Sequence, residues 1–334
     1  MMRANSIAAR RTPTGLPREV AMRFTVCLLC LCGFSDSPMT VAAASLFSGA
    51  MSLPDFDALW NYADPAATEA KFREILPAVP EDQPAYRLEL LTQIARCQGL
   101  QDQFEAAHVT LDVVEKSLDR GTDRTRIRYL LERGRVLNSS GRPGDARPLF
   151  VKAYDIGLKS GEMRLAIDAG HMIAIVEPKV EDQIAWNLKC LELIEKHPDQ
   201  DRWRRAVYIN LGEAYRSAKQ YDRALDSFTR VIEWYEKNGK PVDRYARVDQ
   251  AKMLRMTGHP AESLDKMRAL ETELNGEVDG FVTEEIAECL LVLGRESEAA
   301  PLFRQAWEKL KDEKWLERSE PDRYQRLRTL AATP

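Results

Sequence analysis

Apolar residues recur at helical spacing along residues 202–241. In the first half of this stretch, Tyr208, Leu211, Gly212 and Tyr215 fall on one helical face. After a short polar break, a second face carries Tyr221, Ala224, Phe228 and Val231. Since residues three and four apart share one side of an α-helix, the stretch predicts two amphipathic helices joined by a turn. Small residues are expected where the two helices touch, and aromatic residues where they interlock.

The same hairpin pattern repeats along the chain. A small residue near the start of each second helix recurs at four intervals of 39 residues and a last one of 36: Ala107, Ala146, Ala185, Ala224, Ser263 and Ala299. Twelve residues earlier lie the matching first-helix positions Ala95, Gly134, Ile173, Gly212, Ala251 and Ala287. Four residues later lie the wedge positions Leu111, Phe150, Lys189, Phe228, Met267 and Phe303. The third unit fits badly because Lys189 is charged, and a shift by one residue to Ala174, Trp186, Cys190 and Leu193 improves it.

These markers resemble the tetratricopeptide repeat, whose signature combines an aromatic residue, Leu-Gly, Tyr, Ala and Phe at fixed offsets. The resemblance implies an all-α fold, a right-handed superhelical solenoid of antiparallel helix hairpins, in which first helices line a concave groove. The 39-residue period exceeds the roughly 34 residues of the common repeat. No alternating run of strand length follows Met51.

The pattern divides the chain into four segments. Residues 1–50 are a leader, 51–82 a degenerate N-terminal capping unit, 83–319 six repeats, and 320–334 a C-terminal capping helix. Within the N-terminal cap, residues 55–63 and 65–76 are expected to pair as two short helices. Capping segments are needed because stacked repeats leave an apolar face open at each end.

The leader differs from the rest in charge. It holds five arginines and two acidic residues, a net charge of +3, which leaves −7 for the remainder of a chain whose total is −4. An apolar run at 24–34, with alanines at 42–44, fits part of a secretory signal and would predict export. The alternative is an over-annotated or disordered leader with the true start at Met22 or Met51, which predicts a cytoplasmic protein. The wide separation of Cys97, Cys190 and Cys289 in the sequence suggests no disulfide framework, which favours a reduced, intracellular protein.

The sequence lacks the motifs that mark common enzymes. It has no Gly-rich phosphate loop, no Gly-x-Ser-x-Gly elbow and no His-Glu-x-x-His. None of its four histidines has a His or Cys partner at ligand spacing, which predicts no metal site. We therefore expect a protein without catalytic residues and without a cofactor.

Charge and hydropathy narrow the class of partner. The dense arginines at 124–135 and 202–205 are interleaved with acidic residues in a net acidic chain, which argues against nucleic-acid binding. The apolar run at 24–34 has eleven residues and is too short to span a membrane. A protein or peptide partner of unknown identity is expected, and the oligomeric state is not predicted.

Projecting the first helices onto the concave side gives candidate groove residues. They are Arg96, Arg135, Asn138, His171, Asn210, Glu213, Arg216, Tyr245, Lys252 and Arg255, followed by Phe281, Glu284 and Glu288. The set predicts a basic middle of the groove, which would attract an acidic peptide or a C-terminal carboxylate, and an acidic C-terminal end. The alternatives are that the arginines are simply solvated and that His171 is a half-buried packing residue.

These observations favour a non-enzymatic protein-interaction scaffold that binds an extended or acidic peptide in the concave groove. One alternative is a regulatory repeat protein that senses a ligand or peptide, and another is a hydrolase whose site the sequence does not reveal. The stretch 170–241 resembles bacterial repeat proteins of unassigned role. The carboxylate clamp of chaperone-binding relatives is not expected, because only Asn210 matches it, while Tyr245 and Asp249 stand at the positions of the next unit.

Overall fold

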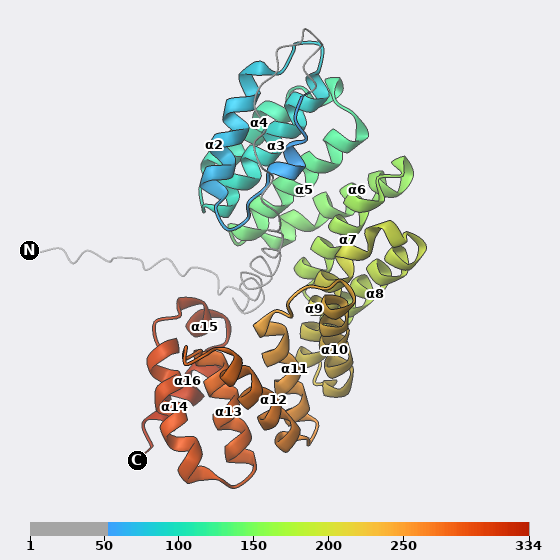
Figure 1. Ribbon diagram of the computed structural model, residues 1–334. Coiled ribbons are helices and arrows are strands. Elements are labelled where there is room, and N and C mark those ends of the chain that lie inside the picture. The colour runs from blue at the N-terminus through green and yellow to red at the C-terminus, as the bar shows by residue number, and fades with distance from the viewer. Residues whose placement is uncertain (1–52, 334) are drawn as a thin grey trace, which may run out of the picture.

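The computed structural model describes residues 53–333, and this part of the chain is helical and contains no strand. Figure 1 shows the helices stacked along a curved path, from the blue N-terminal hairpins to the red C-terminal ones. Six hairpins follow one another: α3 (Pro84–Leu100) with α4 (Phe104–Glu115), α5 (Asp123–Ser139) with α6 (Pro143–Ser160), α7 (Met163–Val176) with α8 (Val180–Lys196), α9 (Arg204–Ser217) with α10 (Tyr221–Lys237), α11 (Arg244–Met256) with α12 (Pro260–Glu273), and α13 (Gly280–Val292) with α14 (Glu296–Leu310). The expected all-α superhelical solenoid is confirmed.

In the five regular hairpins a large side chain of the second helix is buried at the contact with a small residue of the first. Phe150 and Phe228 are fully buried. A Cβ atom added at Gly134 would lie 2.4 Å from the Phe150 ring, and one at Gly212 would lie 2.8 Å from the Phe228 ring. The glycines are therefore required by close approach of the two helices. The wedge residues predicted for the other regular units are buried as well: Leu111, Met267 and Phe303.

The third hairpin follows the shifted register. Cys190 is fully buried and Lys189 is exposed, with its ammonium 4.2 Å from the centre of the Trp186 ring. Ala185, the small residue expected at the hairpin contact, is exposed instead. The prediction at Lys189 and Ala185 was therefore wrong by one residue.

The turn between the two helices explains this irregularity. In the other five hairpins one turn residue has a left-handed backbone, with φ between 58° and 89°: Asp102, Gly141, Lys219, Gly258 and Gly294. The equivalent of Gly141 in the third hairpin is Val180, a β-branched residue that resists this conformation. Pro178 instead holds Glu177 in an extended conformation (φ −64°, ψ 129°), which ends α7 at Val176.

The first helices form the inner side of the curve. α3 packs on α5, α5 on α7, α7 on α9 and α11 on α13, whereas no comparable contact joins the second helices to one another. Because the first helices lie closer together than the second, they line the concave side of the solenoid.

Segments at both ends cover the exposed faces of the stack. The N-terminal one has a 3₁₀ turn η1 (Phe56–Leu59) and the helix α2 (Pro65–Ile75), so the first of the two short helices expected at 55–63 is a single tight turn. At the other end lie α15 (Lys314–Ser319) and α16 (Pro321–Ala331), with Leu327 of α16 buried. The leader at 1–50, with its signal-like run and Cys27, Cys30 and Cys32, lies outside the described residues.

Candidate functional site

Arginines predicted as groove residues lie on the inner face, but they are paired with carboxylates. Arg96 contacts Glu132 at 3.3 Å, and Arg135 contacts the same carboxylate at 2.6 Å and also pairs with Asp168. Both arginine side chains are about one-tenth exposed. The N-terminal half of the groove therefore carries a buried network of two bases and two acids instead of free positive charge.

The arginines farther along the groove are paired in the same way. Arg216 lies 2.5 Å from Glu213 and 3.4 Å from Glu320, and Arg255 lies 2.7 Å from Glu285. Burial acts to lower the pKa of Arg255, but its hydrogen bond to Glu285 and the negative charges of Glu285 and Glu288 together outweigh this, so the pKa is raised and the guanidinium stays charged. The predicted basic middle of the groove is therefore wrong, since each of its four arginines has an acidic partner.

Three of these pairs join one first helix to the next. Arg96 and Glu132 are 36 residues apart, Arg135 and Asp168 are 33 apart, and Arg255 and Glu285 are 30 apart. Such separations are close to the repeat period, so the carboxylates could have been found by searching one period ahead of each arginine. A charge buried without a partner is costly, which explains why the repeats supply one.

In the centre of the inner face, two uncharged side chains contact each other. His171 of α7 shares a 2.9 Å hydrogen bond with Asn210 of α9, and its ring centre lies 5.8 Å from that of Trp203. His171 is 2% exposed, not half-buried as expected. Burial lowers its pKa to about 4, so the ring is neutral at pH 7. Asn138 is also buried, and its Oδ1 atom has no hydrogen-bond partner among the described residues.

The remaining candidates Tyr245 and Lys252 lie on α11. Tyr245 is 42% exposed, and its ring centre is 5.7 Å from that of Phe281. Lys252 lies 3.7 Å from Asp249. Burial and the nearby carboxylate of Glu213 raise the pKa of Asp249 to about 6 against the opposing effect of Lys252. Tyr245 is thus the most open ring on this part of the inner face.

The acidic end of the groove is covered by the C-terminal cap. Arg323 of α16 contacts Glu284 at 2.5 Å, and Arg326 contacts Glu288 at 2.9 Å. Sequence reasoning placed these two glutamates in an open groove and missed both arginines. It also missed Glu320, which reaches back to Arg216 of α9 across 104 residues of sequence.

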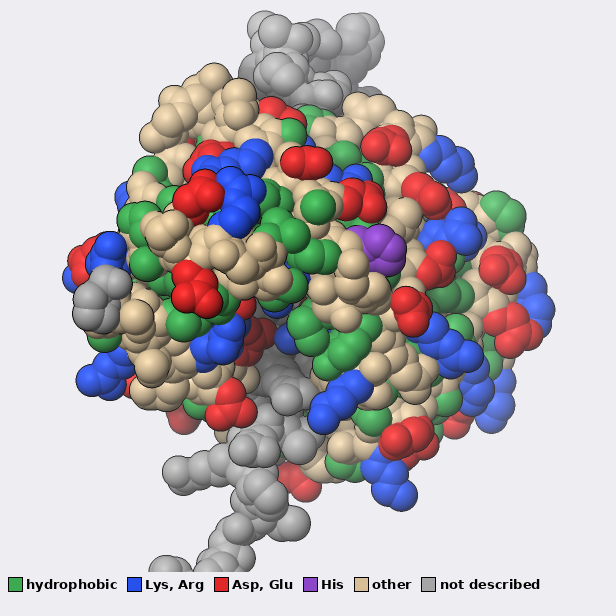
Figure 2. Space-filling view, turned by 90° about the horizontal axis from the view of Figure 1, so that it is seen from below, with side chains coloured by type: hydrophobic (Ala, Val, Ile, Leu, Met, Phe, Trp, Pro, Cys, Tyr) green, Lys and Arg blue, Asp and Glu red, His purple; other side chains and the backbone are tan. Residues whose placement is uncertain are grey.

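Two further features of the described residues are their thiols and their potential metal ligands. Burial raises the pKa of the Cys97, Cys190 and Cys289 thiols to about 12, so these cysteines are protonated at neutral pH. No group of three or more potential metal ligands occurs within residues 53–333. No helix of that region is long and apolar enough to cross a membrane. In Figure 2 acidic and basic side chains are interspersed on the face shown, and neither sign forms a continuous patch there.

Comparisons with known proteins agree with this architecture. Residues 210–309 match the family described as tetratrico peptide repeat. The search of curated proteins finds no match. Among solved structures, a signal-transduction ATPase with a tetratricopeptide repeat sensor from Pyrococcus horikoshii is similar with a TM-score of 0.62 and 13% identity, over 79% of this chain.

This chain spans only 41% of that ATPase. BtubC (BKLC) from P. vanneervenii is similar with a TM-score of 0.52 and 14% identity, over 68% of this chain and 94% of that one. At such identities the similarity shows the fold alone. The family match and the stacked hairpins together identify the chain as a tetratricopeptide repeat protein.

Proposed function

We propose that this protein is a non-enzymatic interaction scaffold that binds an extended peptide segment of a partner protein on the inner side of α7, α9 and α11. The proposal rests on where ion pairs connect neighbouring first helices and where they do not. Within residues 53–333, no ion pair joins α7 to α9 or α9 to α11, whereas ion pairs join α3 to α5, α5 to α7 and α11 to α13. On the central helices a partner would therefore displace no ion pair between neighbouring first helices, and the ion pair from the C-terminal cap that it meets there is that of Glu320 with Arg216.

The side chains on α9 and α11 suit recognition of an extended backbone. Glu213 is 41% exposed, and Asp249 is 31% exposed. Their carboxylates can accept hydrogen bonds from peptide N–H groups. Tyr245 adds an exposed ring, and tyrosine provides contact area at a low entropic cost because it has few rotatable bonds. An extended segment leaves its N–H and C=O groups available for such contacts.

Acidity of the partner is not required at this central surface. Arg135, Arg216 and Arg255 are each matched by carboxylates, so they exert little net attraction on a negatively charged peptide. We therefore propose that the central surface binds a segment of mixed charge. A preference for acidic segments is argued separately below, for a different part of the inner face.

Affinity capture with the full chain tests the proposal. A chain with Glu213→Gln and Tyr245→Ala alters the central inner face, and a chain with Val109→Ala and Val113→Ala alters exposed positions on the second helix α4. We expect a partner from the source cell to be retained by wild type and by the α4 variant, and lost by the inner-face variant. A partner lost only by the α4 variant, or no captured partner at all, would contradict the proposal.

A further inference from the structure

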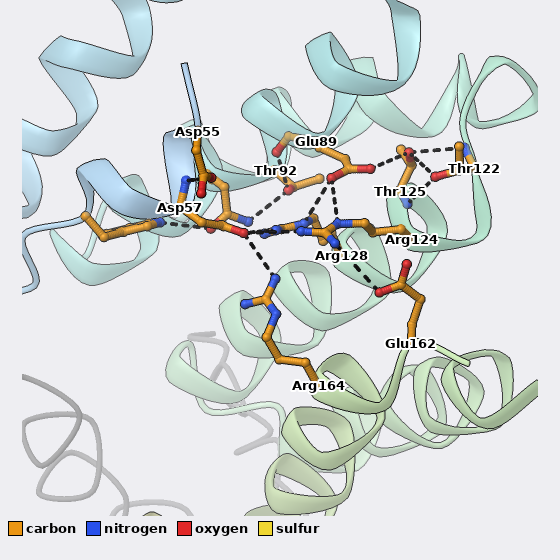
Figure 3. Close-up of polar contacts among 12 residues, drawn as sticks. Asp55, Asp57, Glu89, Thr92, Thr122, Arg124, Thr125, Arg128, Glu162 and Arg164 are labelled. Carbon is orange, nitrogen blue, oxygen red and sulfur yellow. Dashed lines mark hydrogen bonds and ion pairs between the residues drawn. The ribbon is translucent and has the colours of Figure 1, made fainter. Parts of the chain in front are cut away.

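A short acidic segment of the chain itself lies across the inner face of the first three hairpins. Its residue Asp57, in the 3₁₀ turn η1, meets three arginines from much later in the sequence. One carboxylate oxygen accepts hydrogen bonds from Arg124 at 3.3 Å, from Arg164 at 3.1 Å and from Arg128. Figure 3 shows the three guanidinium groups converging on this carboxylate from α5 and α7.

The residue before Asp57 is anchored in an aromatic pocket. Phe56 is 6% exposed, and its ring meets Tyr86 edge-on at 5.1 Å and Phe72 at 6.3 Å between ring centres. The guanidinium of Arg128 lies 5.3 Å from the Phe56 ring centre. An aromatic side chain in a pocket is the usual anchor of a bound peptide.

The backbone and the far end of the segment are also held by side chains. The Tyr86 hydroxyl donates a 2.7 Å hydrogen bond to the carbonyl of Pro54. The Trp60 indole donates to Gln93 of α3 at 3.1 Å. Residues 54–60 are therefore bound through a main-chain carbonyl, an aromatic residue, a carboxylate and an indole, much as a docked peptide is.

The arginines need the carboxylate that η1 provides. Glu89 lies 3.2 Å from both Arg124 and Arg128, and Glu162 lies 3.8 Å from Arg124. Arg164 has Asp57 as its only carboxylate within 4 Å in the described chain. Burial and then the positive charge of Arg128 lower the pKa of Arg164, whereas the negative charge of Asp57 acts to raise it. The site without Asp57 would hold three arginines against two shared carboxylates, which favours binding of another acidic group.

The segment is held mainly by these tertiary contacts. η1 has four residues and is separated from α2 by an irregular turn. A single 3₁₀ turn has little stability of its own, because it closes very few backbone hydrogen bonds. Removal of residues 54–60 from the inner face leaves the contacts between the six hairpins in place, and it uncovers the apolar cluster that Phe56 shares with Phe72 of α2 and Leu90 of α3.

We propose that Arg124, Arg128 and Arg164, with the pocket of Phe72 and Tyr86, form a docking site for an acidic partner segment in which an aromatic residue directly precedes an aspartate. Residues 54–60 occupy this site as a tethered substitute until the partner displaces them. The inference rests on the proposed function, since it assigns one ligand class to one part of the inner face. It also makes partner binding self-inhibited, because a tethered segment competes at an effective concentration on the order of millimolar.

A synthetic peptide with the sequence of residues 53–62, LPDFDALWNY, is the probe. Fluorescence anisotropy with a labelled peptide measures its binding to the full chain and to a full-length Phe56→Ala/Asp57→Ala variant, whose own segment has lost both anchors. We expect the variant to bind the peptide at least about tenfold more tightly than wild type, since the tethered competitor is weakened. A probe with the second aspartate replaced by asparagine should bind the variant at least about tenfold more weakly.

A matched pair of arginine changes in the variant background tests the site itself. Arg164→Gln removes one guanidinium from the site and should weaken binding of the peptide. Arg126→Gln should not, because among residues 53–333 the ion pair of Arg126 is with Asp123 on the surface of α5. Circular dichroism and thermal melting establish that each variant is folded. If a folded Phe56→Ala/Asp57→Ala chain fails to bind the peptide, or if Arg164→Gln and Arg126→Gln behave alike, the inference is wrong.

A third outcome concerns exchange between two copies of the chain. Light scattering of wild type that shows a dimer, converted to monomer by added peptide, would mean that the segment docks on a second copy, and it would overturn the tethered arrangement. Failure of any of these tests leaves the proposed function standing, because the Glu213→Gln/Tyr245→Ala capture experiment alters neither the segment nor its arginines. If the Glu213→Gln/Tyr245→Ala variant loses the captured partner but leaves binding of the LPDFDALWNY peptide unchanged, the central surface and the arginine site are two distinct binding sites.

Discussion

The contact between Gly134 and Phe150 makes a quantitative prediction about the hairpin core. Gly134→Ala would place a Cβ atom 2.4 Å from one ring carbon of Phe150 and 2.7 Å from another, so the ring or the helix must move by about 1 Å to restore an ordinary contact. The ring is fully buried and cannot yield without disturbing its neighbours. Overpacking of this kind costs about 1–3 kcal/mol, against which alanine gains up to about 1 kcal/mol over glycine in a helix.

Gly144→Ala is the matched control. Gly144 lies in the first turn of α6, and a Cβ atom added there meets nothing within 4 Å. We expect urea titrations followed by circular dichroism to show Gly134→Ala less stable than wild type by about 1–2 kcal/mol, and Gly144→Ala equal to wild type or up to about 1 kcal/mol more stable.

A double-mutant cycle identifies the physical cause. Phe150→Leu provides a smaller side chain opposite residue 134, so the cost of Gly134→Ala should shrink when the two changes are combined. The reasoning is refuted if Gly134→Ala and Gly144→Ala have the same effect, or if the cost of Gly134→Ala is unchanged in the Phe150→Leu background.

Three further predictions concern the charges of the inner face. Burial lowers the pKa of His171 in the folded chain to about 4, so between pH 6.5 and 4 the proton binds mainly to the unfolded chain. The free energy of unfolding of wild type should therefore fall by up to about 3 kcal/mol over this range. In urea titrations, the free energy of unfolding of His171→Gln should depend less on pH. The pKa of Asp249 is raised to about 6 in the folded chain, so ionisation of this carboxyl opposes folding. Asp249→Asn should therefore raise the melting temperature at pH 7.5. This gain should vanish below about pH 4, where the wild-type carboxyl is protonated in both the folded and the unfolded state. Arg323→Gln should destabilise the chain by about 3 kcal/mol in urea titrations because Glu284 is left buried, whereas Arg326→Gln, at a half-exposed position, should cost less than about 1 kcal/mol.

The hairpins were predictable because their signals are local and repeat. Small residues such as Gly212 and wedges such as Phe228 keep one spacing, and any short stretch contains both members of the contact. The third unit was predictable only in part. Its register depends on a turn in which Val180 replaces a residue with a left-handed backbone, and hydrophobic spacing alone does not report backbone angles.

The charge state of the inner face was not predictable from the first helices taken one at a time. Exposure was inferred correctly for Tyr245, whose neighbours leave it open. It was inferred wrongly for Arg135, because its partner Asp168 belongs to another repeat. Asp57 was missed for a related reason: it reaches Arg164 across 107 residues, and the N-terminal cap has no periodic partner that would signal the contact.

The inner face is therefore divided into three parts that differ in what a partner must displace. Residues 54–60 lie over α3, α5 and the start of α7, and α16 covers the glutamates of α13. Between them, α9 and the adjoining parts of α7 and α11 are covered least, since the cap meets α9 only through the contact of Glu320 with Arg216 among the described ion pairs. Packed helices lie about 8–10 Å apart, so the span from α7 to α11 is roughly 20 Å. An extended chain covers that distance with about six residues at roughly 3.3 Å each. Displacement of residues 54–60 would add α3 and α5, a further two spacings, and lengthen the footprint to about twelve residues. A partner that carries an acidic aromatic motif about six residues away from its central contact would then engage both sites at once, and its affinity would exceed that of either contact alone.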